Sequence, residues 1–196
     1  TFQLNFTPRP AATNATLTLC EKTAGGGTAD FTLTNADATV TGGASGVAVT
    51  YHTTLADARG DTNPLSSPYT SGATTLYARV ENTTTGCYRT ATLTLNINSK
   101  PVIADGLTTI CEGATVDLTG LITSYGTYSN PVWTIATVGG TSVTTPAAVK
   151  PSSTTTYILV AENGSVCKDT AQAVVTVNPR PVIADGAVTI CEGATV

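Results

Sequence analysis

The feature that most constrains this chain is an internal repeat. Residues 101–116 read PVIADGLTTICEGATV, and residues 181–196 read PVIADGAVTICEGATV. The two segments are identical at 14 of 16 positions and lie 80 residues apart. A fixed period of this length is typical of architectures in which one small structural unit recurs along the chain. Because the second copy stops within a strand pattern, we expect these 196 residues to be a window of a longer repeat array.

A looser third copy marks each seam between the units. The segments 4–10 (LNFTPRP), 95–101 (LNINSKP) and 175–181 (VTVNPRP) align, and each ends on a proline ten residues before a Cys-Glu pair. Proline favours an extended residue before it and supplies no backbone donor. The last strand of one unit is therefore predicted to run almost straight into the next, through short and stiff hinges at Pro10, Pro101 and Pro181.

The repeat also predicts the domain boundaries. Residues 1–8 would be the last strand of a preceding repeat, residues 9–98 and 99–179 two repeats with one disulfide each, and residues 180–196 the start of a third. Units of this size bury only a modest core, so they benefit from a covalent staple.

Composition and patterning favour strands throughout. Threonine accounts for 42 of the 196 residues, and β-branched side chains fit a pleated, half-exposed surface. Short alternating runs are separated by turn signals every eight to twelve residues, which is typical of a two-sheet sandwich. The predicted fold class is therefore all-β, with tandem immunoglobulin-like β-sandwich domains in an extended array. Tyr51 and Trp133 are expected to be equivalent core aromatics on the central strands.

A few local expectations can be checked individually. Residues 31–34 and 38–40 are predicted to form one interrupted strand. Residues 55–59 are predicted to form a single helical turn that ends at Gly60. The strand pairs 75–80 with 88–97 and 156–161 with 170–177 are predicted to close the two repeats as hairpins.

The five cysteines follow the repeat. Cys20 and Cys87 fall in the first repeat, Cys111 and Cys167 occupy the equivalent places in the second, and Cys191 is left unpaired in this window. One bridge in each repeat, Cys20–Cys87 and Cys111–Cys167, is the predicted pairing, with free buried thiols as the alternative. Persistent disulfides would place the chain in an oxidising compartment outside the cytoplasm.

The residues indicate no catalytic site. His52 is the only histidine, so neither a catalytic triad nor a histidine-rich zinc site can be assembled, and its position in a strand suggests a structural role. The glycines at 25–27 precede a strand and not a helix, which argues against a phosphate-binding loop. We expect no enzyme activity, no cofactor and no metal. Calcium, shared at the seams by Asp105 with Glu112 and by Asp185 with Glu192, is the weak alternative.

Charge and hydropathy limit the kinds of partner that the chain is expected to bind. Only 11% of the residues are charged and the net charge is −4, which argues against nucleic-acid binding. The sequence contains no apolar run of the length that a membrane span needs, so no membrane insertion is expected. A surface rich in hydroxyl groups suits a glycan coat or packing against neighbouring molecules.

Specific segments resemble a known class of proteins. The runs 46–51 (GVAVTY), 55–58 (LADA), 62–65 (TNPL), 76–82 (LYARVEN) and 85–88 (TGCY) look like a repeat of giant secreted surface proteins of Bacteroidota. Residues 110–113 (ICEG) and the strand that ends at 177–179 (VNP) look like the immunoglobulin-like module of the same proteins. This resemblance implies export by the type 9 secretion system, and gliding-motility adhesins of the SprB kind are its best-known representatives. In the same phylum Asp169-Thr170-Ala171 resembles an O-glycosylation signal, which makes Thr170 a candidate site.

Together, these observations predict a structural stalk or filament segment of a large extracellular adhesin on the cell surface. Such a segment would supply length and multivalent attachment, including attachment during gliding motility, without catalysis. The alternative is a carbohydrate-binding or spacer module of a secreted enzyme. The predicted partners are neighbouring repeats of the same chain, with self-association into fibres or binding to surface polysaccharide as further possibilities.

Overall fold

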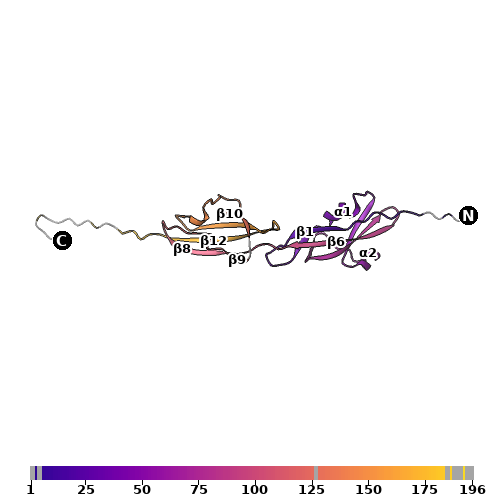
Figure 1. Ribbon diagram of the computed structural model, residues 1–196, viewed down its shortest axis with the longest axis horizontal. Coiled ribbons are helices and arrows are strands. Elements are labelled where there is room, and N and C mark those ends of the chain that lie inside the picture. The colour runs from indigo at the N-terminus through magenta and orange to yellow at the C-terminus, as the bar shows by residue number, and fades with distance from the viewer. Residues whose placement is uncertain (1–2, 4–5, 126–127, 184–185, 187–191, 193–196) are drawn as a thin grey trace. The chain divides into compact units, whose positions relative to one another are not determined.

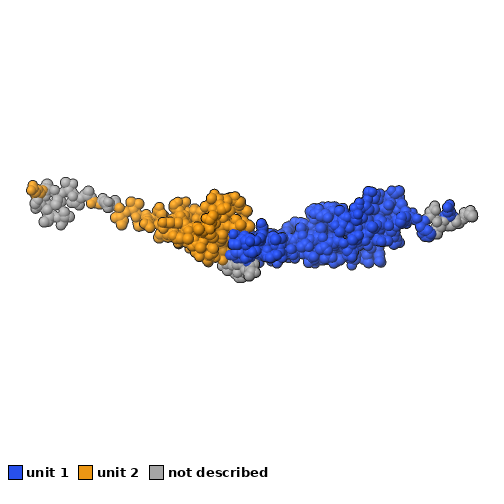
Figure 2. Space-filling view, turned by 45° about the horizontal axis from the view of Figure 1, so that its top comes forward, with its two compact units in different colours: residues 1–102, 124–131, 161–169 blue, residues 103–123, 132–160, 170–196 orange. Residues whose placement is uncertain are grey.

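The computed structural model of the chain describes residues 3, 6–125, 128–183, 186 and 192 (Figure 1). It separates into two compact units. Unit 1 comprises residues 1–102, 124–131 and 161–169, and unit 2 comprises residues 103–123, 132–160 and 170–196 (Figure 2). Below, "first repeat" and "second repeat" keep their sequence ranges, 9–98 and 99–179.

The described residues form mainly strands. The strands are β1 (Ala15–Cys20), β2 (Ala29–Phe31), β3 (Val47–His52), β4 (Tyr69–Ser71), β5 (Thr74–Asn82), β6 (Tyr88–Asn98), β7 (Val102–Ala104), β8 (Gly106–Cys111), β9 (Thr123–Tyr125), β10 (Ser129–Ile135), β11 (Thr155–Glu162) and β12 (Lys168–Asn178). The short helices are η1 (Leu33–Ala36), α1 (Asp37–Thr41), α2 (Leu55–Gly60) and η2 (Pro146–Ala148).

The first repeat is a two-sheet sandwich. One sheet has the strand order β1-β6-β5-β3, and the other consists of β2 and β4. The pairs β5–β6 and β3–β5 are antiparallel, whereas β1 pairs with β6 in parallel, with Ala15 opposite Leu93 and Cys20 opposite Asn98. This parallel pairing means that β1 and β6 end at the same edge of the sheet.

The core of the first repeat lies between these sheets. Alternate residues of the long strands point inward, so that Leu76, Leu93 and Leu95 pack with Phe31 of β2 in one buried cluster. Burying an aliphatic or aromatic side chain of this size stabilises the fold by about 1.5–3 kcal/mol. Tyr51 belongs to the same cluster, and its hydroxyl donates to Asp37 Oδ1 at 2.7 Å. The predicted burial of Tyr51 is confirmed.

The second repeat reproduces the main sheet. Its strand order is β10-β11-β12-β8, and β8 pairs with β12 in parallel, with Cys111 opposite Asn178. β7 and β9 form a separate two-stranded sheet. Trp133 of β10 is buried, as its equivalence with Tyr51 predicts. The predicted all-β sandwich fold class is therefore confirmed.

Two local predictions have different outcomes. The helical turn at residues 55–59 is confirmed as α2, which runs one residue further to Gly60 and is capped by Thr54, whose side chain accepts from the Asp57 amide. The interrupted strand predicted at residues 31–34 and 38–40 is wrong beyond Phe31, where β2 ends, because the following residues form η1 and α1 instead. Val40 and Thr41 are buried with helical spacing from Ala36, and this tertiary packing overrides the strand preference of β-branched residues.

Candidate functional site

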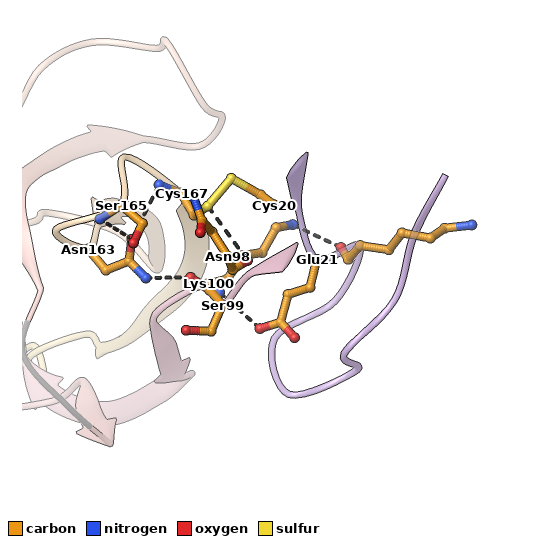
Figure 3. The surroundings of a disulfide bond; sticks show 9 residues. Cys20, Glu21, Asn98, Ser99, Lys100, Asn163, Ser165 and Cys167 are labelled. Atoms are coloured by element: carbon orange, nitrogen blue, oxygen red, sulfur yellow. Dashed lines mark hydrogen bonds between the residues drawn. A yellow bond between two sulfur atoms is a disulfide. The ribbon is translucent and has the colours of Figure 1, made fainter. Parts of the chain in front are cut away.

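A disulfide between the two repeats is the most distinctive site in the structure. Cys20, at the end of β1, is bonded to Cys167, which precedes β12, and the two lie 147 residues apart in sequence (Figure 3). Their Cα atoms are 5.7 Å apart. All residues around the bond belong to unit 1, because the turn between β11 and β12 falls in that unit.

The predicted pairing of one bridge in each repeat is therefore wrong. Cys20 is bonded to Cys167, whereas Cys87 and Cys111 are free. The physical reason is the parallel pairing of the first and last strands. Cys20 stands beside Asn98 at the end of β6, but Cys87 precedes the start of β6. An 11-residue strand separates these two positions by about 35 Å, far beyond the roughly 7 Å that a disulfide allows between Cα atoms. The same geometry separates Cys111 from Cys167 along β12.

A turn built around Asn163 presents Cys167 to its partner. The side-chain oxygen of Asn163 accepts from the amides of Ser165 and Cys167, at 3.0 and 3.3 Å. The side-chain nitrogen of Asn163 donates to the carbonyl of Ser99, in the linker that follows β6 (Figure 3). Cys167 is fully buried, and its Sγ lies 3.7 Å from the carbonyl oxygen of Asn98. The hairpin tip of the second repeat is thus held against the end of β6 by polar contacts as well as by the covalent bond.

Glu21 anchors the linker on the other side. Its carboxylate accepts three backbone hydrogen bonds of 2.9 Å, from the amides of Gly25, Gly27 and Lys100. Gly25 and Gly27 both have positive φ, a conformation that glycine adopts readily. The N–H groups of Gly27, Lys100 and Gly25 hold the pKa of Glu21 below its ordinary value, because they stabilise the charged form. The glycine-rich turn therefore binds an anion, but that anion is the protein's own carboxylate.

The predicted hinge at Pro101 lies within this network. Only Ser99, Lys100 and Pro101 separate β6 from β7, and Pro101 is buried. Lys100 also donates through Nζ to the carbonyl of Lys22 at 2.9 Å. Pro10 is half-buried and Pro181 is exposed. That these prolines act as stiff hinges stays a prediction.

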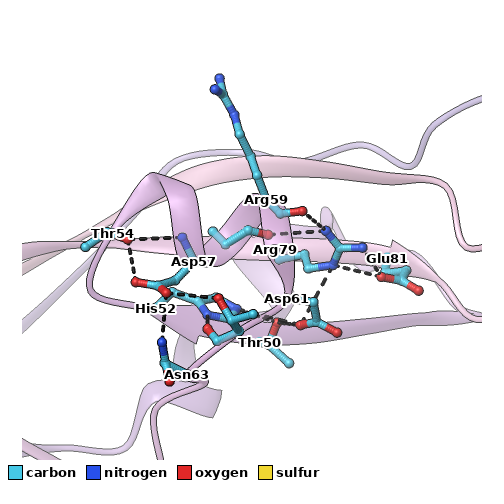
Figure 4. Close-up of polar contacts among 11 residues, drawn as sticks. Thr50, His52, Thr54, Asp57, Arg59, Asp61, Asn63, Arg79 and Glu81 are labelled. Carbon is cyan, nitrogen blue, oxygen red and sulfur yellow. Dashed lines mark hydrogen bonds and ion pairs between the residues drawn. The ribbon is translucent and has the colours of Figure 1, made fainter.

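A second polar cluster surrounds the buried guanidinium of Arg79 (Figure 4). Arg79 donates to the carbonyl oxygens of Ala58 and Arg59 at the end of α2, at 3.2 and 3.1 Å. It also forms an ion pair with Glu81, and its Cζ lies 3.5 Å from the centre of the Tyr88 ring. A cation in this position satisfies the unpaired carbonyls of the helix end. This cluster stabilises the first repeat.

His52 is fully buried beside this cluster, which supports the structural role expected from the sequence. Its Nδ1 donates to the carbonyl oxygen of Thr62 at 2.7 Å, and its Nε2 lies 2.9 Å from Thr50 Oγ1. The Asp57 carboxylate nearby receives hydrogen bonds from the side chains of Thr54, Asn63 and Thr62, and these bonds lower its pKa. All of these hydrogen bonds are made within the first repeat.

The remaining candidate residues lie apart from the disulfide. Thr170 is exposed on β12, and its glycosylation stays a prediction. Among the described residues, no three His, Cys, Asp or Glu side chains gather in a way that could hold a metal ion. Asp105 accepts from the Gln172 amide at 2.8 Å. Asp185 and Cys191 lie outside the described residues. None of the helices in the described part of the chain is long and apolar enough to cross a membrane.

Comparison with known proteins agrees with this geometry. Residues 16–101 match the family model of the Flavobacterium inter-domain disulphide bond domain. The match begins in β1 and ends in the linker, so it contains Cys20 and the network around Glu21. Flavobacterium belongs to the Bacteroidota, the phylum to which the sequence resemblance points. The description of that family names a disulfide bond between domains.

Solved structures with some similarity consist of immunoglobulin domains. The Ig1-2 module of the Drosophila receptor tyrosine phosphatase DLAR is 16% identical, with 87% of this chain and 96% of that chain covered and a TM-score of 0.31. Titin domains I67–I69 are 10% identical, with coverages of 88% and 65% and a TM-score of 0.30. The four N-terminal domains of Dscam1 are 16% identical, with coverages of 54% and 33% and a TM-score of 0.28, so the chain spans about a third of that structure. No relative was found among curated proteins.

The chain thus combines an all-β sandwich fold with a disulfide between its repeats, and its residues 16–101 match a family of a non-catalytic kind, which suggests a structural or adhesion-type module. The disulfide indicates an oxidising compartment outside the cytoplasm. Sequence reasoning predicted four bonded cysteines; two of them, Cys20 and Cys167, are bonded, but to each other, and Cys87 and Cys111 are free. Cys20 reaches the seam that follows its repeat because β1 runs parallel to β6 and ends beside Asn98.

Proposed function

We propose that this chain is a segment of the stalk or filament of a large secreted surface adhesin of the Bacteroidota, of the kind that serves attachment and gliding motility. The observation that carries the proposal is the Cys20–Cys167 disulfide, which spans a seam between two sequence repeats. A bond in this place joins two sequence repeats in addition to the backbone. A protein that transmits force or maintains its length at the cell surface needs such a connection.

The Glu21 network supports the same function. A flexible tether needs no fixed linker, yet here Ser99 and Lys100 are both held by side chains, one from Asn163 and one from Glu21. In a stalk these contacts would limit bending at every seam. The partners we propose are the neighbouring repeats of the same chain, and the place of action is the cell surface.

The proposal is tested by removing repeats from the gene in its own host. Deletion of residues 102–181 removes one full period from Val102 to Pro181 and joins Pro101 directly to Val182, so that the seam sequence 95–101 stays intact. We expect the exported surface filament to become shorter in electron micrographs by a fixed amount for each period removed, while secretion continues. Unchanged filament dimensions, or the absence of this protein from the cell surface, would refute the proposal.

Glycan binding provides the contrasting outcome. If the 196-residue chain is instead a carbohydrate-binding module of a secreted enzyme, it should bind specific glycans on an array at micromolar concentration. A stalk segment should bind none of them above the signal of its denatured form. Specific retention of one glycan class would favour the alternative function.

A further inference from the structure

We infer that Cys87 and Cys111 are the halves of two further inter-repeat disulfides, of the same kind as Cys20–Cys167. Cys111 would bond the hairpin cysteine of a following repeat, and Cys87 would bond the strand-end cysteine of a preceding repeat. The inference rests on the proposal that this chain belongs to an array of such repeats. It predicts a continuous series of covalent bonds in which every repeat is joined to both neighbours.

Cys111 occupies the same structural position as Cys20. Each is the last residue of a strand that pairs in parallel with the closing strand of its repeat, opposite Asn98 for Cys20 and opposite Asn178 for Cys111. The next residue repeats the contact, since the Glu21 amide donates to Asn98 O at 3.0 Å and the Glu112 amide donates to Asn178 O at 2.8 Å. Cys20 is bonded in this position, whereas Cys111 is exposed with a free thiol.

The residues around Cys111 also resemble those around Cys20. Arg180 is the linker residue equivalent to Lys100, and its Nε donates to the carbonyl of Glu112 at 3.0 Å. A shallow surface hollow is lined by Glu112, the residue after Cys111, together with Gly113, Lys150 and Arg180. In the first seam, the hairpin tip with Asn163 and Cys167 lies against the equivalent linker. A hairpin of this form, from a following repeat, is the partner that the Cys111 site fits.

Cys87 occupies the same structural position as Cys167. Each cysteine follows a turn that begins with Asn, and the backbone N–H of that Asn donates to the backbone carbonyl of the cysteine. The distance is 2.9 Å for Asn82 with Cys87 and 3.1 Å for Asn163 with Cys167. The Cys167 Sγ lies 3.7 Å from Asn98 O, and the Cys87 Sγ lies 4.0 Å from Thr7 O.

Thr7 is the residue that aligns with Asn98 at the end of the preceding strand. The Cys87 sulfur is therefore already placed against the backbone of the segment that leads into the first repeat. A strand-end cysteine that pairs beside Thr7, as Cys20 pairs beside Asn98, would meet it.

The chemistry is a balanced thiol–disulfide exchange. Each new bond consumes one thiol of this chain and one thiol of the neighbouring repeat, with the loss of two protons and two electrons. The electrons reduce the disulfide of a thiol oxidase of the compartment to a dithiol. The thiolate of exposed Cys111, or of half-buried Cys87, attacks the disulfide of the oxidase to form a mixed disulfide, and the thiolate of the neighbouring repeat then displaces the reduced oxidase.

The test is disulfide mapping of the protein secreted by its own host, with free thiols alkylated before digestion. Trypsin combined with cleavage after glutamate separates the cysteines, since Cys87 falls in peptide 82–89, Cys111 in 90–112 and Cys167 in 163–168. We expect the peptide of residues 82–89 to be disulfide-linked through Cys87 to a peptide that ends in Cys-Glu. We expect the peptide of residues 90–112 to be linked through Cys111 to a peptide from a hairpin turn that begins with Asn.

The outcomes separate this inference from the proposed function. Alkylated Cys87 and Cys111, or a bond between these two cysteines, would overturn the inference, while a shorter filament after repeat deletion would still support the stalk. As a matched control, a secreted Cys111→Ser variant should leave Cys20–Cys167 intact and render the partner hairpin cysteine alkylatable. A partner peptide that stays bonded in this variant would also overturn the inference.

Discussion

Removal of the Cys20–Cys167 bond should destabilise both units. The proposed perturbation is Cys20→Ser, because Cys20 is half-buried, whereas Cys167 is fully buried and would leave a cavity or a buried hydroxyl if it were replaced. The variant keeps the Cys167 side chain in place and removes only the covalent connection.

The magnitude follows from the loop that the bond closes. When the whole chain unfolds, the bond closes a loop of 147 residues, which corresponds to about 5 kcal/mol in the chain-entropy model. If the second repeat unfolds while the first stays folded, Cys20 remains fixed beside Asn98. The closed loop is then the 69 residues between Asn98 and Cys167, which corresponds to about 4 kcal/mol. The order of unfolding therefore changes the expected loss little.

The assay is urea unfolding of the oxidised protein, of Cys20→Ser and of Cys111→Ser, followed by circular dichroism without alkylation, so that buried Cys167 keeps its natural side chain. We expect Cys20→Ser to lose about 3–5 kcal/mol in free energy of unfolding. Cys111→Ser is the matched control at the equivalent position of the second repeat, where the thiol is exposed and unbonded, and it should change stability by less than about 0.5 kcal/mol. A loss below about 1 kcal/mol in Cys20→Ser, or equal losses in the two variants, would refute the reasoning.

Three further predictions concern force, pH and the buried cation. When the oxidised protein is pulled by its termini, the disulfide should keep the 147-residue segment between the bonded cysteines from extending. Reduction or Cys20→Ser should therefore add about 50 nm to the contour length of the unfolded chain in single-molecule force traces. Equal contour lengths would contradict this prediction. Because the pKa of Glu21 is lowered in the folded state, its stabilising effect is present above the ordinary value of 4.5 and is lost as the pH falls through the folded pKa. The melting temperature should therefore drop more between about pH 6 and pH 3 in the natural protein than in Glu21→Gln, and parallel curves would count against the network. Arg79→Ala should lower the free energy of unfolding in urea by about 2–3 kcal/mol, because two backbone carbonyls and Glu81 lose their partner. The control Arg89→Ala, at an exposed position, should lower it by less than about 0.5 kcal/mol. Similar losses in the two variants would show that the cluster is unimportant.

Much of the fold could be predicted from the sequence because strand patterns are local. The alternation along residues 75–80 and 88–97 specifies which face of β5 and β6 is buried, and the turn residues between them specify the hairpin. The equivalence of Tyr51 and Trp133 follows from the repeat itself. The helix α1 could not be predicted in this way, since its residues prefer strands and only packing on the core makes them helical.

The disulfide pairing could not be predicted, because it depends on the direction in which distant strands pair. Cys20 and Cys87 flank the same repeat, and an antiparallel β1–β6 pair would have brought them together. With β1 parallel to β6, they stand at opposite ends of a strand. The seam pattern did contain a hint. If the chain enters a sandwich at one end and leaves it at the other, its first and last strands must run in the same direction, which already excludes a bridge between Cys20 and Cys87.

The same topology explains why the bond matters for a protein exposed outside the cell. The two repeats are connected once by the backbone through residues 99–101 and a second time by Cys20–Cys167. Any single cut of the backbone between Cys20 and Cys167 leaves all parts of the chain covalently joined, because the disulfide closes that segment into a ring. The linker of residues 99–101 lies within this ring, as do the exposed turns of both repeats, where proteases cut most readily. Because Cys20 lies beside Asn98, at the start of the linker, a cut at any of these places leaves the two repeats joined.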